Sequence, residues 1–478
     1  MKIRNSLLWG TCLFALSLSC FASSDGEIFR QRREHLISKL EGGIAILKNT
    51  PVYVRNNDVD YVYRTDSDFY YLTGCDIPDA VMILTAGSET PFVLFIDPPS
   101  RMAALWGSRH YTPAQAQDTF EADTVYALEN LQDKFSELTG PRKTVYYDLK
   151  NAEINDLMRE ASKSRWGSKP DTFRDLLPFV HQMRMIKSPH EIDQMRHAIE
   201  ATCAGLNESM RAVRPGMYEY EIQAILEYQF RINDCPFNGF PSIVASGPNA
   251  TILHYEQNDR LMQSGELLLM DVGAEYNYYG ADITRTFPVN GTFTKEQAEI
   301  YQLVLDAQEA AIDSMIPGVP AYHCHNASEN VIKQGLLRLG LITDAESRWQ
   351  YLLYYFPYIN HSLGMDVHDV GDFGRTRSGG VPLEPGMVMT NEPALYFGEN
   401  WIATFRRGAP RRYQVEPDSV DAFLQEVMPV YKKYMDIGIR IEDDILITPD
   451  GNEVLSKNTP KKIGEIEAIM REESIFNR

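Results

Sequence analysis

A carboxylate at the end of an apolar run is the feature that most constrains how this chain folds. Residues 266–271 read ELLLMD, so Asp271 closes a segment typical of a buried strand. A polar connection, 274–280, ends in glycine and leads to Asp282 and a second apolar run. We predict a hairpin whose antiparallel pairing brings both aspartates side by side on one face. Adjacent carboxylates repel each other unless they share a proton or a cation, so the pair predicts a cation site; two unrelated acids on a solvated hairpin are the alternative.

Two histidines follow in the segment from His361 to His368, close to a glycine that permits near approach of the backbone. A single histidine is more often structural than a ligand. Two at this spacing, in a chain that already has paired acids, favour a functional site. We predict that His361 is a metal ligand and that His368 contacts substrate.

Two glutamates complete the candidate set. Glu392 stands at the end of a predicted strand, 387–390, although an exposed strand-end acid is an equally good interpretation. In the segment GIRIEDD, 438–444, Arg440 and Glu442 alternate with isoleucines and therefore share one face of a strand. A surface ion pair is the commoner interpretation of such a pair in isolation.

Together these residues form a hard, oxygen-rich donor set: Asp271, Asp282, His361, Glu392 and Glu442. Such donors suit Mn²⁺ best, and Zn²⁺, Fe²⁺ and Co²⁺ are also compatible. One cation would leave surplus negative charge. Two cations about 3.5–4 Å apart would balance it and could hold a bridging hydroxide that attacks a carbonyl. We therefore predict a two-metal hydrolase.

The chain has 478 residues, more than one hydrophobic core usually serves, so two domains are expected. Short apolar runs alternate with helical segments over 27–165, which predicts an N-terminal α/β domain. A linker is predicted at 166–189. Over 190–465, strands with long helices between them predict an α+β domain, a curved antiparallel sheet covered by helices. Its last strand is predicted as one element, 437–447, and residues 403–434 as an insertion between two strands.

The first residues are predicted to be removed from the mature protein. Lys2 and Arg4 precede a short apolar run, 7–18, and then small residues, which is the pattern of a secretory signal peptide over 1–22. A lipid-modified Cys20 is the alternative, although the residues before it fit that signal poorly. We predict an exported protein, periplasmic or secreted.

Charge and cysteine spacing exclude several classes of protein. A formal charge of −20 argues against binding to nucleic acid or to an anionic membrane surface. No pair among the four cysteines beyond the signal region has CxxC spacing, so a thiolate metal cluster is not expected. Buried free thiols are the preferred interpretation, and the spacing leaves any disulfide pairing open.

The order Asp, Asp, His, Glu, Glu, with the local sequences MDVG, ADITRTFPV, LGMDVHDVG, LEPGM and GIRIEDD, resembles the pita-bread metallopeptidases. Within them the chain is similar to the aminopeptidase P and prolidase branch, with an accessory α/β domain followed by the catalytic domain. The resemblance implies that the five donors above are the metal ligands. It also implies that Asp282 and Glu442 bridge both ions.

Further roles follow from the same resemblance. His254 matches a histidine of the substrate site, His368 one that contacts the scissile peptide region, and Arg440 an arginine that supports the site through its acidic neighbours. Glu392 would also shuttle the proton of the hydroxide. The implied activity is that of an Xaa-Pro aminopeptidase, which releases the N-terminal residue when proline is second. Prolidase, an Xaa-Pro dipeptidase, is the alternative, and a metal-free binding protein is weaker because all five donors are present. A homo-oligomer is also implied.

One departure from this branch lies directly before the ligand His361. Its members usually carry a further histidine upstream, whereas this chain has Pro357 four positions before the ligand, with Tyr358 and Asn360 beside it. Asn391 is also less usual than an apolar residue. We predict that the proline pocket or the rate differs, while none of the predicted ligands is changed.

Overall fold

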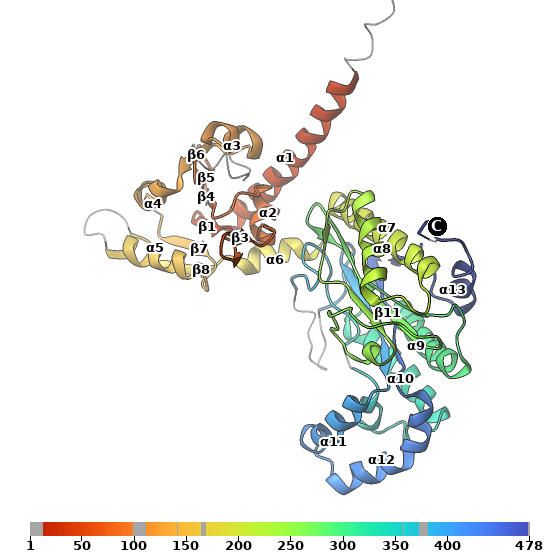
Figure 1. Ribbon diagram of the computed structural model, residues 1–478. Helices are drawn as coiled ribbons and strands as arrows, with labels where there is room; N and C mark the ends of the chain where they lie inside the picture. The colour runs from red at the N-terminus through yellow and green to blue at the C-terminus, as the bar shows by residue number, and fades with distance from the viewer. Residues whose placement is uncertain are drawn as a thin grey trace, which may run out of the picture. The chain divides into compact units, whose positions relative to one another are not determined.

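The computed structural model describes residues 13–98, 111–140, 142–163, 169–356, 358–371 and 381–476. Side chains are described from residue 26 onward within these ranges. The chain divides into two compact units, Met1–Met183 and Arg184–Arg478 (Figure 1). Helix α1 spans Leu13–Lys39, so the predicted signal peptide overlaps its start. The basic residues of that signal and the side chain of Cys20 lie outside the described part.

A six-stranded mixed sheet forms the centre of the first unit, in the order β6-β5-β4-β1-β7-β8. The middle strands β1, β4 and β5 are antiparallel, and the outer pairs are parallel. Valine and isoleucine side chains of these strands make a buried core with Phe135. This confirms the predicted α/β class. The strands are β1 (Ile44–Lys48), β4 (Val81–Thr85), β5 (Phe92–Ile96), β6 (Thr124–Ala127), β7 (Thr144–Tyr147) and β8 (Thr172–Asp175).

Short helices connect these strands, and a small hairpin of β2 (Val54–Asn56) and β3 (Val59–Asp60) stands apart from the sheet. The segment predicted as a linker, 166–189, contains β8 and helix α6 (Leu177–Met185). Residues 164–168 lie outside the described part. The helices are α2 (Ser67–Thr73), α3 (Pro113–Phe120), α4 (Leu131–Thr139) and α5 (Ala152–Lys163).

Helices with well-formed N-termini frame the second unit. Ser188 and Glu191 make a reciprocal capping box that starts α7 (Pro189–Ala212), and Pro189 occupies its first turn. Thr294 and Gln297 do the same for α9. These local signals explain why the two helices begin at Pro189 and Lys295. This unit also contains α8 (Glu219–Ile232), α10 (Tyr322–Arg338) and α13 (Ile463–Ile469), and α9 spans Lys295–Ser314.

The strands of the second unit pair antiparallel throughout its described ladders. Helix α7 packs on the strands that follow β11, and α9 packs on β15, β16 and β17. One sheet contains β10 (Ile243–Ser246), β11 (Leu267–Val272) and β14 (Ile283–Pro288). A second contains β15 (Val388–Asn391), β18 (Asp443–Thr448) and β19 (Gly451–Val454). The other strands are β9 (Phe237–Asn238), β12 (Ala274–Tyr276), β13 (Tyr279–Gly280), β16 (Ala394–Tyr396) and β17 (Gly438–Arg440).

The prediction of one strand over 437–447 is wrong. The segment is two strands, β17 paired with β16 and β18 paired with β15 and β19, with Glu442 between them. The amide of Glu442 donates to the carbonyl of Thr284 at 3.1 Å, and its carbonyl accepts from Arg285 at 2.6 Å. The ladder breaks because the backbone of Glu442 bonds to these residues of β14.

The predicted insertion is a helical hairpin between β16 and β17, and it begins a few residues earlier than expected. It consists of α11 (Glu399–Tyr413) and α12 (Pro417–Tyr431), drawn in blue in Figure 1. Within the described residues, no helix is long and apolar enough to cross a membrane. The cysteines Cys75, Cys203, Cys235 and Cys324 are buried free thiols, in agreement with the preferred interpretation.

Candidate metal centre

The two aspartates share one face of the β11–β14 pair, but they are offset. Asp271 is paired with Thr284, and Asp282 lies two positions before that threonine, just outside β14. Because alternate residues of a strand point to the same side, both carboxylates face the same side as Thr284. The predicted juxtaposition therefore exists as a diagonal contact across the hairpin. The connection between the two aspartates is also more regular than expected. In it, β12 and β13 pair antiparallel and are joined by a tight turn at Asn277 and Tyr278, which have positive φ.

The predicted ligands His361 and Glu392 are held beside each other by backbone contacts. The amide of Thr390 donates to the carbonyl of His361 at 3.0 Å, and the amide of Glu392 donates to the carbonyl of Ile359 at 2.7 Å. The carbonyl of Ser362 lies 3.1 Å from His361 Nδ1 and accepts a hydrogen bond from it. This leaves Nε2 as the free lone pair, directed at the acids.

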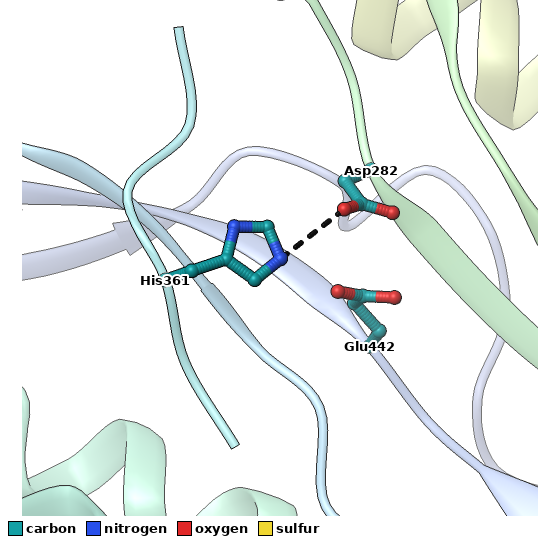
Figure 2. A group of neighbouring side chains, drawn as sticks. All are labelled: Asp282, His361 and Glu442. Atoms are coloured by element: carbon teal, nitrogen blue, oxygen red, sulfur yellow. Dashed lines mark ion pairs between the residues drawn. The ribbon is translucent and has the colours of Figure 1, made fainter. Parts of the chain in front are cut away.

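Three of the predicted ligands form a compact group: Asp282, His361 and Glu442. One donor atom from each lies within 4.8 Å of the others. Figure 2 shows the imidazole reaching toward the two carboxylates from a separate segment of the chain. His361 Nε2 lies 3.4 Å from Asp282 Oδ2 and 3.6 Å from Glu392 Oε1. The fourth predicted ligand, Glu392, therefore borders this group.

The fifth predicted ligand, Asp271, contacts the guanidinium of Arg440. Arg440 donates through Nη2 to Asp271, through Nη1 to Tyr396 Oη at 2.6 Å and through Nε to Thr284 Oγ1 at 3.1 Å. The Thr284 hydroxyl in turn donates to Glu442 Oε2 at 2.6 Å. Arg440 thus contacts Asp271 directly and Glu442 through the Thr284 hydroxyl.

The four carboxylates of the site outnumber the cationic side chains that contact them. Burial, and then the neighbouring acids, raise the pKa of Asp282 and of Glu442 well above the ordinary values. Burial also raises the pKa of Glu392, against the opposing effects of His361 and Arg440. Asp271 Oδ1 is buried and has no hydrogen-bond partner among the described residues. A buried acidic cluster with an unused oxygen fits divalent cations.

A buried ion pair next to Glu442 holds the backbone of that residue in place. Arg285 is fully buried; it donates to the carbonyl of Glu442 and, at 2.7 Å, to Asp443 Oδ1. Lys461 Nζ donates to Asp443 Oδ2 at 2.7 Å. Although burial raises the pKa of Asp443, these two cations hold it well below the usual range. Asp443 therefore stays charged as the counterpart of Arg285.

All the predicted site residues line one cavity of about 640 Å³: His254, Asp271, Asp282, His361, His368, Glu392, Arg440 and Glu442. The ring of His368 packs edge to face on that of His361, with centroids 4.5 Å apart. Tyr358 and Asn360, which flank the ligand in the unusual segment, also line the cavity, whereas Pro357 lies outside the described residues.

Several residues of the site are absent from the sequence-based prediction. Thr284 was detectable, because strand alternation places it on the face of Asp271 and Asp282. Tyr396 and His325 had no such signal, since each reaches the site only through the tertiary fold. His325 comes from α10, lines the cavity and lies 3.1 Å from Glu329 through Nε2.

Comparison with known proteins agrees with this arrangement. Residues 193–449 match metallopeptidase family M24, and residues 29–146 match the aminopeptidase P N-terminal domain. Xaa-Pro aminopeptidase of Escherichia coli (strain K12) is 35% identical over 456 residues, which cover 92% of this chain and 97% of that protein. The structure of Pseudomonas aeruginosa aminopeptidase PepP has a TM-score of 0.83 and 38% identity, and covers 93% of this chain and 98% of its own.

A second solved structure, aminopeptidase P from E. coli with the inhibitor Pro-Leu, also has a TM-score of 0.83, at 34% identity. It covers 93% of this chain and 98% of its own. These matches confirm the two-domain architecture, an α/β domain followed by a pita-bread domain, that the sequence predicts.

Proposed function

Because the chain belongs to metallopeptidase family M24, we propose that it is a metal-dependent Xaa-Pro aminopeptidase. It releases the N-terminal residue from peptides that have proline at the second position. Proline fixes φ and removes the amide hydrogen, so the preceding bond needs a dedicated site. The relatives described above, an Xaa-Pro aminopeptidase and an aminopeptidase P, support this choice over prolidase.

The observation that carries the proposal is the shared cavity wall. Five predicted metal ligands, two histidines and an arginine come from separate segments, and all face the same cavity. A metal-free binding protein on this fold would have no need for several acids whose pKa values are raised by burial and by their proximity.

Two divalent cations fit this donor set, held by Asp271, Asp282, His361, Glu392 and Glu442. When bound, they supply Lewis acidity that polarises a peptide carbonyl and lowers the pKa of a bound water. We propose Mn²⁺ as the preferred ion, because four of the five donors are carboxylates, with Zn²⁺, Co²⁺ or Fe²⁺ able to substitute.

The protein groups around the donors supply proton transfer and orientation. Glu392 takes the proton of the attacking water and passes it to the leaving amine. His254 and His368 on the cavity wall hold the peptide backbone on either side of the scissile bond. Arg440 holds the Asp271 carboxylate in place through a direct ion pair.

A peptide-length series tests the activity. Metal-free protein is reconstituted with Mn²⁺ or Zn²⁺ and assayed on Xaa-Pro-Xaa, Xaa-Pro and Xaa-Ala-Xaa peptides. We expect hydrolysis of the first alone and its loss in Glu392→Gln. Hydrolysis of the dipeptide alone would make the protein a prolidase. No hydrolysis by protein with both sites loaded would favour a binding protein.

Export, processing and assembly are also part of the proposal. The N-terminal pattern supports cleavage after Ala22 and a periplasmic or secreted protein, with a lipid on Cys20 as the alternative. The resemblance supports a homo-oligomer. N-terminal sequencing of protein from a cell that exports it, with mass spectrometry for a lipid, tests the first; light scattering tests the second.

A further inference from the structure

Arg184 in the last turn of α6 and Lys187 in the short connection to α7 both contact the loop that carries His368. Arg184 Nη2 donates to Asp369 Oδ1 at 2.5 Å, and Lys187 Nζ donates to Asp369 Oδ2 at 3.0 Å. The side chains of Lys187 and Asp369 are 1% exposed, and that of Arg184 is 3% exposed. Two cations therefore hold both oxygens of one buried carboxylate.

Asp369 is joined directly to His368 and closes the loop around it. The amide of Asp369 donates to the carbonyl of Ser362 at 2.9 Å. The ring of His368 lines the cavity and packs on the ring of His361. A shift of Asp369 therefore reaches the wall of the site through a single peptide unit.

The loop is shaped to admit this ion pair. A Cβ on Gly364 would lie 2.1 Å from Asp369 Oδ2 and 2.9 Å from Lys187 Cε, so a larger residue would displace the pair. The carbonyl of Gly364 accepts from the amide of Gly280 at 2.9 Å, and the amide of Lys187 donates to the carbonyl of Gly386 at 2.8 Å. Backbone hydrogen bonds therefore hold Lys187 and the glycine that lies against the ion pair.

We propose that Arg184 and Lys187 are positioning residues, which set the place of His368 in the site through Asp369. This inference rests on the proposed function, since it concerns the same reaction. Although burial raises the pKa of Asp369, Lys187 and Arg184 hold it below its ordinary value, so the pair stays charged at neutral pH. The alternative is that the two cations stabilise the fold alone.

A double-mutant cycle separates these alternatives. Lys187→Met is measured in the wild-type background and in His368→Ala, with saturating Mn²⁺ and an Xaa-Pro-Xaa peptide. We expect kcat/KM to fall about 10–100-fold in the wild-type background, since displacing a group by about 1 Å costs that much. In His368→Ala the same change should cost less than about 3-fold, because the lysine acts through the missing ring. Equal losses in both backgrounds would overturn the proposal.

A double variant that removes both charges of the Lys187–Asp369 pair distinguishes a loss of activity from a folding defect. Lys187→Met combined with Asp369→Asn leaves no unpaired buried charge from these two residues. We expect its Tm to return toward the wild-type value while kcat/KM stays low. Recovery of activity together with Tm would mean that the lysine serves stability alone, and the proposal would fall.

A matched ion pair and a conservative variant complete the test. Arg196 makes a two-bond pair with Glu453 near the surface of the same unit, so Arg196→Met should leave kcat/KM unchanged. Lys187→Arg should restore most of the loss, because the charge is kept. Wild-type protein that is inactive on every peptide would refute the proposed function. Active wild-type protein with unaffected Lys187 variants would refute only this inference.

Discussion

A single hydroxyl links the two sides of the metal centre. Thr284 Oγ1 accepts a hydrogen bond from Arg440 and donates one to Glu442. Arg440 also contacts Asp271, so this hydroxyl relates a predicted ligand on β11 to a predicted ligand between β17 and β18. Hydrogen bonds to metal-ligating carboxylates orient them and tune their affinity.

Thr284→Val tests this link, because it removes both hydrogen bonds while keeping the shape of the side chain. We expect metal affinity to fall about 10–100-fold, as for other contacts to ligating groups. Loss of buried hydrogen bonds should also cost about 1–3 kcal/mol of stability. Competition with a chelating dye measures the affinity, and chemical denaturation of metal-free protein measures the stability.

Thr202→Val is the matched control for this change. Thr202 is fully buried on α7; it donates to the carbonyl of Ala198 and accepts from the amide of Ala274, and it is not one of the residues that line the cavity. Its loss should lower stability by a similar amount and leave metal affinity as it is. An equal drop in metal affinity in both variants would show that Thr284 acts through general stability.

The raised pKa of Glu442 predicts a particular pH dependence for metal-free protein. Its pKa in the fold lies above the unfolded value because of burial and the nearby Asp282. The stability from its protonated form is complete below the ordinary pKa of about 4.3 and is lost as pH rises through the folded pKa. Glu442→Gln removes this loss. In calorimetry with EDTA, the Tm of the variant should exceed wild type by an amount that grows from about pH 4 to pH 8.

Glu453→Gln should show the opposite trend. The hydrogen bond from Arg196 lowers the pKa of Glu453, so its stability is present above the ordinary carboxyl pKa and is lost in acid. This variant should be destabilised at neutral pH, and the difference should vanish toward about pH 3. A Tm difference for Glu442→Gln that stays flat across pH would contradict the sign argued above.

At the scale of elements, local signals predict helices better than strand breaks. Helix α9 begins at Lys295 because the capping box of Thr294 and Gln297, which can be read from the sequence, starts it there. The break between β17 and β18 escaped prediction because it depends on Thr284 and Arg285, which are distant in sequence. The candidate ligands could be picked out from short motifs, whereas Tyr396 and His325 required the fold.

The helical insertion touches the site through one aromatic stack. Trp401 on α11 packs on Tyr396, with ring centroids 5.0 Å apart, and its Nε1 donates to the carbonyl of Thr251 at 2.8 Å. Tyr396 Oη accepts from Arg440. The insertion is thereby connected to the arginine that holds Asp271.

Trp401→Ala should therefore lower kcat/KM by about 10-fold and stability by about 1–3 kcal/mol, because the ring that backs Tyr396 is lost. Steady-state kinetics and thermal unfolding measure the two effects. Trp349→Ala is the control: Trp349 stacks on Phe405 and packs edge to face on Phe423, both in the same insertion. It should cost similar stability with little change in kcat/KM. Equal kinetic losses would remove the special role of Trp401.

At the scale of the whole molecule, the predicted ligands all belong to one of the two units. Each unit has its own core: the six-stranded sheet in residues 1–183 and the paired sheets around the cavity in residues 184–478. A ligand stabilises the state to which it binds, so cations should act on the unfolding of the second unit.

Metal removal should therefore change one thermal transition and leave another in place. At free Mn²⁺ about 100 times its Kd, each site adds about 2.7 kcal/mol to the folded second unit. We expect calorimetry to show two transitions, and EDTA should lower the midpoint temperature of only one of them. In Glu442→Gln, that same transition should no longer respond to metal. A single transition that moves as a whole would mean that the two cores unfold together, so that metal binding at Asp282 and His361 supports the entire chain.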